Sequence, residues 1–142
     1  MDTSQILKKY QIIAVIGCST DVTKDSNIVP AYMLSKGFRI IPINPNGGTI
    51  LGQKSYKSME GIPYDRKSRI EIVNIFRPSS ELLPIVHSIV KDKKAMPSLK
   101  VIWAQLGIQD EAAKQLAEQN GFTFVQNRCM MKDYKVKFSV SI

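Results

Sequence analysis

The stretch that most constrains this chain is an apolar run that ends in a glycine. Residues 12–16 are all apolar and lead directly into Gly17, and a short polar segment then precedes the apolar pattern of a helix. An unbroken β-branched run bounded by turn residues is typical of a strand buried on both faces of a parallel sheet. Glycine lets the chain turn sharply after the strand, and the next helix start offers free N–H groups and a positive dipole end. The sequence therefore predicts a phosphate-bearing, nucleotide-type ligand at the end of this first strand.

The length of the chain and its hydropathy limit its organisation. With 142 residues and 44% hydrophobic content, we expect one domain over residues 1–142 with a sizeable core. That core is expected over about residues 10–129, and residues 130–142 form a tail. No apolar run is long enough to span a bilayer, and the first residues lack the apolar region of a signal peptide. We therefore expect a cytoplasmic protein without a membrane partner.

Charge and reactive side chains exclude several function classes. The formal charge of +8 suits an anionic small molecule, nucleic acid or a solvated surface, but the chain has no helix-turn-helix, zinc-finger or RNP pattern. Sequence-specific nucleic-acid binding is therefore not expected. Cys18 and Cys129 make no disulfide framework, and no Cys/His cluster indicates a metal. The one histidine, His87, lies in an apolar helical stretch, so the sequence offers no catalytic residue and an enzyme is the less favoured class.

Strand and helix patterns alternate along the chain. The predicted strands cover residues 11–16, 38–43, 70–76, 99–104 and 122–126, with a short extended piece over residues 53–56. Helices are predicted from Asp2 or Thr3 to Tyr10, from Asp25 or Ser26 to Gly37, over residues 58–61, from Ser79 or Ser80 to about Lys93, and from Asp110 to Gly121. Pro30 is expected near the first turn of its helix, where its missing N–H costs least.

Two segments fall outside this alternation. Residues 64–69 are polar and charged, so we expect an exposed connection there. The tail over residues 130–142 alternates weakly through Val136, Phe138 and Val140, which suggests a loose edge strand or a disordered segment.

The alternation predicts an α/β fold with an open, mainly parallel sheet of five to six strands and helices on both faces. Right-handed crossovers place the carboxyl ends of the strands on one edge of the sheet. Ligands bind outside those ends, where the strand order reverses. Five loops meet at this edge, namely residues 17–19, 44–46, 76–78, 105–107 and 127–129.

A dinucleotide such as NAD is the usual ligand of such a sheet, and this sequence argues against it. The fingerprint needs G-x-G-x-x-G and an acidic residue about 20 positions further on. Here the first loop has a single glycine, and the second strand ends in Asn44-Pro45 rather than in Asp or Glu. A phosphate-binding loop of the Walker type is absent as well. An NAD-binding regulatory domain therefore stays as an alternative only.

Six segments carry a resemblance, and they read IIAVIGCST, SKGFRIIPINP, GGTILGQKSYKSMEGIP, IVNIFRPSSELLPIV, VIWAQLGIQDEAA and VQNRC. Together, and in this order from about Tyr10 to Cys129, they resemble the small stand-alone CoA-binding protein family. These are single Rossmann-like domains similar to the CoA-binding domain of the succinyl-CoA synthetase α subunit. The resemblance implies a Rossmann-like fold that binds coenzyme A or acyl-CoA. Pro30 departs from it, because the family usually has a plain helix former there.

CoA carries a pyrophosphate and a 3′-phosphate, which need free amides and nearby cations. The amides of Gly17, Cys18 and Ser19 are the predicted pyrophosphate donors. Lys24 and Arg77 are the predicted cations, because one lies at a helix start and the other follows a strand. A thiol at a helix start can be reactive, but we interpret Cys18 chiefly as a small residue in a tight loop.

The remaining parts of CoA are assigned to the neighbouring loops. Asn44, Pro45 and Asn46 are predicted to form a wall against adenine and ribose. Phe76 and Pro78 offer an apolar surface on the other side.

The resemblance also implies that Gln105 and Gly107 border the pantetheine arm. It leaves a second alternative, a subunit of an acyl-CoA synthetase that acts with a separate partner. A homodimer is possible as well, and nothing in the sequence decides between these arrangements.

Overall fold

The fold is built on a five-stranded parallel sheet. The structure is a computed structural model that describes residues 1–138. The strands follow the order β2-β1-β5-β6-β7, and every neighbouring pair is parallel. Their bounds are β1 Ile12–Ile16, β2 Arg39–Ile43, β5 Ile72–Ile75, β6 Val101–Ala104 and β7 Thr123–Val125. A short antiparallel pair, β3 (Thr49–Ile50) and β4 (Gln53–Lys54), follows β2. The predicted open α/β sheet is confirmed.

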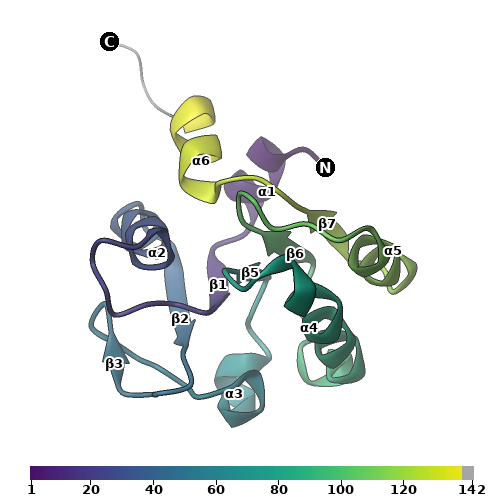
Figure 1. Cartoon of the computed structure of the whole chain (residues 1–142), viewed down its shortest axis with the longest axis horizontal. Helices are drawn as coiled ribbons and strands as arrows, with labels where there is room; N and C mark the ends of the chain where they lie inside the picture. The colour runs from purple at the N-terminus through teal and green to yellow at the C-terminus, as the bar shows by residue number, and fades with distance from the viewer. Residues whose placement is uncertain (139–142) are drawn as a thin grey trace.

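Helices cover both faces of the sheet (Figure 1). The α-helices are α1 Thr3–Lys9, α2 Asp25–Ser35, α3 Tyr64–Lys67, α4 Ser79–Lys91, α5 Glu111–Gln119 and α6 Met130–Phe138, and the 3₁₀ turns are η1 Met59–Gly61 and η2 Lys93–Ala95. Helices α1, α2 and α6 pack on one face, and α4 and α5 pack on the other. Within residues 1–138, no helix is both long and apolar enough to cross a bilayer.

The apolar run in β1 shows why the sheet is central. Ile13 and Val15 are fully buried under α1, α2 and α6, and Ala14 is fully buried on the opposite face. Each buried branched side chain contributes about 1.5–3 kcal/mol relative to an exposed one. A continuous apolar run is stable here because alternate side chains enter two separate cores.

Two of the predicted helix caps are confirmed. The Asp2 carboxylate accepts from the Gln5 N–H at 2.9 Å, and the Asp2 N–H donates to the Gln5 side chain at 2.8 Å, which is a capping box. Asp110 accepts from the Ala113 N–H at 3.1 Å.

The other two predicted caps are wrong. Helix α2 has Lys24 and helix α4 has Pro78 at the N-cap, and neither gives a side-chain cap hydrogen bond. The Ser79 hydroxyl instead accepts from the Gln109 N–H at 3.0 Å and so connects α4 to the loop before α5.

The tail prediction is wrong over residues 130–138, which form helix α6. Met130 is fully buried, and the Tyr134 ring packs against the rings of Tyr32, Phe38 and Phe138. Residues 139–142 of the predicted tail lie outside the described residues. A spacing of four places Met130, Tyr134 and Phe138 on one side of the helix, which outweighs the weak strand-like alternation.

The predicted exposed connection over residues 64–69 is also partly wrong. Its first part is the short helix α3, and Lys67 is buried with an ion pair to Asp92 just after α4. A buried lysine needs a charged partner, and Asp92 supplies one.

Candidate functional site

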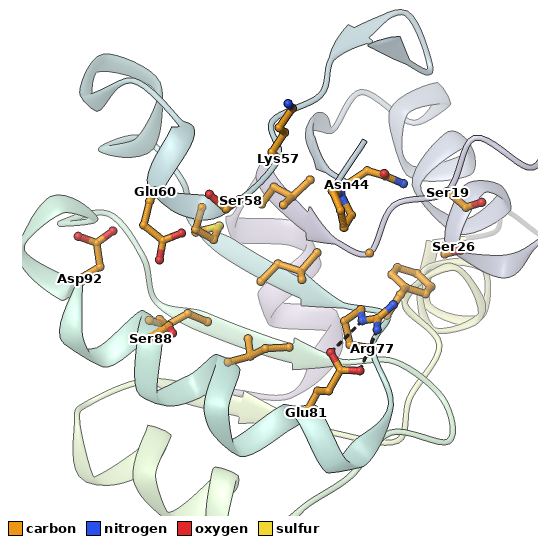
Figure 2. Close-up of a pocket in the computed structure, with 18 of the residues that line it drawn as sticks. Ser19, Ser26, Asn44, Lys57, Ser58, Glu60, Arg77, Glu81, Ser88 and Asp92 are labelled. Carbon is orange, nitrogen blue, oxygen red and sulfur yellow. Dashed lines mark hydrogen bonds and ion pairs between the residues drawn. The ribbon is translucent and has the colours of Figure 1, made fainter. Parts of the chain in front are cut away.

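A cavity of about 620 Å³ opens where the strand order reverses. Strand β1 has β2 on one side and β5 on the other, and the loops after these three strands contribute Gly17, Asn44 and Phe76 to the lining. The segment over residues 57–60 and helix α4 form the side walls (Figure 2). Ligands of open α/β sheets bind at this topological position.

The cavity has two chemically different ends joined by apolar side chains. Its apolar lining consists of Ile16, Ile43, Pro45, Met59, Phe76, Ile85, Ile89 and Met96. Figure 2 shows Ser19 and Ser26 at one end, and Glu60, Ser88 and Asp92 at the other. The cations that line it are Lys24, Lys57 and Arg77. Asp92 is paired with Lys67 and Arg77 with Glu81, whereas Lys24 and Lys57 make no ion pair within residues 1–138.

The amides of the first loop are already engaged. The Gly17 and Cys18 N–H groups donate to the Ile43 carbonyl at 3.0 and 3.2 Å, and the Ser19 N–H donates to the Ser26 carbonyl at 3.1 Å. These three amides are the predicted pyrophosphate donors, and in the structure they are engaged with carbonyls of β2 and α2 instead. Within residues 1–138, the amides of Asp25 and Ser26 at the start of α2 have no hydrogen-bond acceptor. These two N–H groups lie at a helix start, and Ser19 and Ser26 line the cavity beside them.

Asn44 connects two of the loops. Its amide nitrogen donates to the Cys18 carbonyl at 2.8 Å, and its side-chain oxygen accepts from the Asn46 N–H at 2.8 Å. Both polar atoms of the side chain are thus used to position the loops after β1 and β2.

Gly17 is required by its surroundings as well as by its backbone angle. Its φ is +84°, and a Cβ at this position would lie 3.0 Å from the Arg77 Cδ and 3.0 Å from the Phe76 carbonyl oxygen. The glycine therefore permits a close approach of the loop after β5, which brings Arg77 to the cavity.

Arg77 lines the cavity and forms a bidentate ion pair with Glu81. Its Nε donates to Glu81 Oε1 at 3.1 Å and its Nη2 donates to Glu81 Oε2 at 2.8 Å (Figure 2). The Glu81 hydrogen bonds raise the pKa of Arg77 above its ordinary value, so the guanidinium stays charged. Within the described chain, Nη1 makes no hydrogen bond and remains available to an anion.

Cys18 belongs to the first loop, and its side chain is fully buried. Burial raises the pKa of the Cys18 thiol to about 11, so the thiol is neutral at physiological pH. This agrees with a small packed residue rather than with a reactive thiolate.

Seven of the twelve predicted binding residues line the cavity, namely Gly17, Ser19, Lys24, Asn44, Pro45, Phe76 and Arg77. The other five, Cys18, Asn46, Pro78, Gln105 and Gly107, do not. Gln105 is buried and its side-chain oxygen accepts from the Met130 N–H at 3.0 Å, while the Gly107 N–H donates to the Asn127 side chain at 2.7 Å. The loop after β6 is thus held by contacts within the protein.

Sequence reasoning missed the contribution of helix α4. Glu81, Ile85, Ser88 and Ile89 line the cavity, and their spacing of four, seven and eight positions puts them on one helix face. The available signal was that the polar residues Glu81 and Ser88 lie on the same side of the helix as Ile85 and Ile89. Lys57 and Glu60 carried no comparable signal, because they belong to an irregular segment.

Known proteins with this fold are similar over almost the whole chain. The uncharacterized protein YneT of Bacillus subtilis is 31% identical over 129 residues, which cover 91% of this chain and 89% of YneT. Prb, the PH1109 protein redesigned for binding, is 32% identical with a TM-score of 0.86, and the match covers 99% of this chain and 93% of Prb. A hypothetical protein from Pyrococcus horikoshii is 32% identical with a TM-score of 0.85, covering 97% of this chain and 91% of that protein.

A comparison with models of protein families identifies the family of this chain. The model of the CoA binding domain matches residues 11–135, which takes in every strand of the sheet and most of helix α6. The resemblance inferred from the sequence is therefore confirmed, and this chain belongs to the CoA-binding domain family.

Proposed function

We propose that this chain binds coenzyme A or acyl-CoA in the cavity at the carboxyl ends of β1, β2 and β5, without catalysis of its own. The observation that carries the proposal is the convergence of Ser19, Lys24, Ser26 and Arg77 on one cavity of a CoA-binding domain. Each of these residues offers a hydrogen bond or a positive charge to a phosphate.

The phosphates belong at the end of the cavity nearest α2. The unpaired amides of Asp25 and Ser26 and the exposed ammonium of Lys24 suit the pyrophosphate. Within residues 1–138, Arg77 Nη1 makes no hydrogen bond, and Arg77 lines the cavity, so this nitrogen suits the second phosphate group. An anion at a helix start is stabilised by about 0.3–1 kcal/mol by the dipole alone, so the cations are expected to supply much of the affinity.

The adenosine part belongs between the loops after β2 and β5. Pro45 lies on one side of the cavity and the half-buried Phe76 on the other, and both offer apolar surface to a flat base. NAD is disfavoured because Asn44, at the end of β2, has both side-chain atoms engaged and carries no carboxylate for the ribose hydroxyls.

Within residues 1–138, no serine that lines the cavity is hydrogen-bonded to a histidine or carboxylate that could act as its base. The Cys18 thiol is neutral and buried, and His87 is exposed on α4 and absent from the lining. Binding without catalysis is therefore favoured over a complete acyl-CoA synthetase activity.

Calorimetric titration with CoA, dephospho-CoA, acetyl-CoA and NAD tests the proposal. We expect CoA and acetyl-CoA to bind at least tenfold more tightly than NAD, because the cavity offers cations rather than a ribose-binding acid. Lys24→Ala should weaken CoA binding about threefold to tenfold. Lys36→Ala removes the same charge at the other end of α2 and should change the affinity less than twofold. Binding of NAD alone, or equal losses in both variants, would contradict the proposal.

A further inference from the structure

Pro30 is a departure from the family pattern, and the structure places it in the interior of helix α2. The sequence predicts it near the first turn, but the helix starts at Asp25 and Pro30 is buried five residues further on. Proline has no N–H and its ring crowds the carbonyl of the residue four positions earlier, which weakens an ordinary helix. That carbonyl belongs to Ser26.

The Ser26 carbonyl has found a partner outside the helix. It accepts the N–H of Ser19 at 3.1 Å, across the loop that borders the cavity. In an uninterrupted helix the same oxygen would accept the N–H of residue 30. The absence of this donor leaves the oxygen free for Ser19.

Every polar backbone atom of Ser19 is fixed by this arrangement. The Ser19 carbonyl accepts from the side chain of the buried Asn27 at 2.8 Å, so α2 holds both sides of the residue. The Ser19 hydroxyl oxygen accepts from the Asp21 N–H at 3.0 Å. Its own proton is therefore available to a ligand in the cavity, which Ser19 lines.

We infer that Pro30 is a positioning residue for the ligand. By lacking an N–H, it releases the Ser26 carbonyl to hold the Ser19 amide, and Ser19 in turn presents its hydroxyl to a phosphate oxygen. The ligand part of this inference rests on the proposed function, whereas the hydrogen-bond part does not.

Two variants test whether the missing N–H is the cause. Pro30→Ala and Pro30→Val both restore the N–H, and valine keeps most of the volume of the ring. Pro84→Ala is the matched control, because Pro84 is also inside a helix but is exposed and does not line the cavity. The measurements are amide hydrogen exchange at Ser19 by NMR and calorimetric titration with CoA.

We expect the Ser19 amide to exchange at least about fivefold faster in both Pro30 variants, since one hydrogen bond is weakened. CoA affinity should fall about threefold to tenfold in the same variants. Pro84→Ala should change neither quantity more than twofold. A purely structural role for Pro30 would lower the unfolding temperature without a selective change at Ser19.

Unchanged Ser19 exchange in both variants would overturn the inference. Faster exchange with unchanged CoA affinity would overturn the positioning role. If the parent protein itself fails to bind CoA, the proposed function is wrong, and the exchange result still decides whether Pro30 controls the Ser19 amide.

Discussion

The carboxyl edge of the sheet has an open half and a closed half. In the open half, the loops after β1, β2 and β5 surround a cavity of about 620 Å³. In the closed half, the loops after β6 and β7 bond to each other and to α6 through Gln105, Gly107 and Asn127. The Trp103 indole N–H also donates to the Arg128 carbonyl at 2.9 Å there. The loops of both halves bond within the protein, so the difference lies elsewhere. The loop after β6 bonds to the loop after β7 and to helix α6, whereas the loops after β1, β2 and β5 leave a cavity between them.

The largest expected effect comes from the glycines of the two halves. Gly17→Ala adds a Cβ that meets Arg77 and the Phe76 carbonyl, whereas Gly107→Ala has a similar φ of +85° but nothing within 4 Å. We expect Gly17→Ala to lower the free energy of unfolding by about 3 kcal/mol and Gly107→Ala by about 1 kcal/mol. CoA affinity should fall more than tenfold only in Gly17→Ala. Chemical denaturation and calorimetry measure both effects, and equal effects in the two variants would remove the distinction between the halves.

The second prediction concerns the buried Cys18 thiol in the loop after β1, in the open half. The pKa of Cys18 is raised from 9.0 to about 11 by burial, so between these values the unfolded chain loses its thiol proton while the folded chain keeps it. Stability linked to Cys18 is thus fully present below about pH 9 and is lost as the pH rises to about 11, by roughly 3 kcal/mol in total.

Urea denaturation of the parent and of Cys18→Ala at pH 8, 9 and 10 isolates this contribution. By pH 10 the parent should lose roughly 1 kcal/mol more than the variant, which cannot titrate at this position. Parallel curves for the two proteins would show that water reaches the thiol.

The third prediction separates stability from binding. Gln105→Ala leaves the buried Met130 N–H without its acceptor and should lower the free energy of unfolding by about 2 kcal/mol, with CoA affinity within twofold of the parent. Ser88→Ala removes an exposed hydroxyl in the open half and should leave stability unchanged within about 0.5 kcal/mol. A tenfold loss of CoA affinity in Gln105→Ala would return Gln105 to the pantetheine role that the family resemblance implied.

The smallest expected effect concerns the Arg77–Glu81 ion pair. Both side chains are about half exposed, at 46% and 45%, so Glu81→Gln should change stability by less than about 0.5 kcal/mol. CoA affinity should rise about twofold to threefold, because the guanidinium no longer shares its charge with a carboxylate. The gain should shrink with added salt, which a titration series in NaCl measures. A fall in affinity would indicate that Glu81 orients Arg77 instead.

The fold was predictable because parallel strands buried on two faces give continuous apolar runs. All five predicted strands contain an observed one, and three of the five predicted loops contribute residues to the cavity. The sequence did not distinguish these three from the loops after β6 and β7. Helix α6 was missed because Val136 and Phe138 alternate like a strand, although Met130 and Tyr134 already had helical spacing. The engaged amides of Gly17 and Cys18 had no sequence signal at all, because their acceptor is the Ile43 carbonyl on another strand.

The ion pair between Lys67 and Asp92 restrains one end of the cavity. It joins helix α3 to the residue that follows α4. The segment over residues 57–60 and helix α4 are thus linked through their neighbours near Asp92, at the end of the cavity far from Ser19. We therefore expect the cavity to widen less easily at the Asp92 end than at the Ser19 end when a ligand binds.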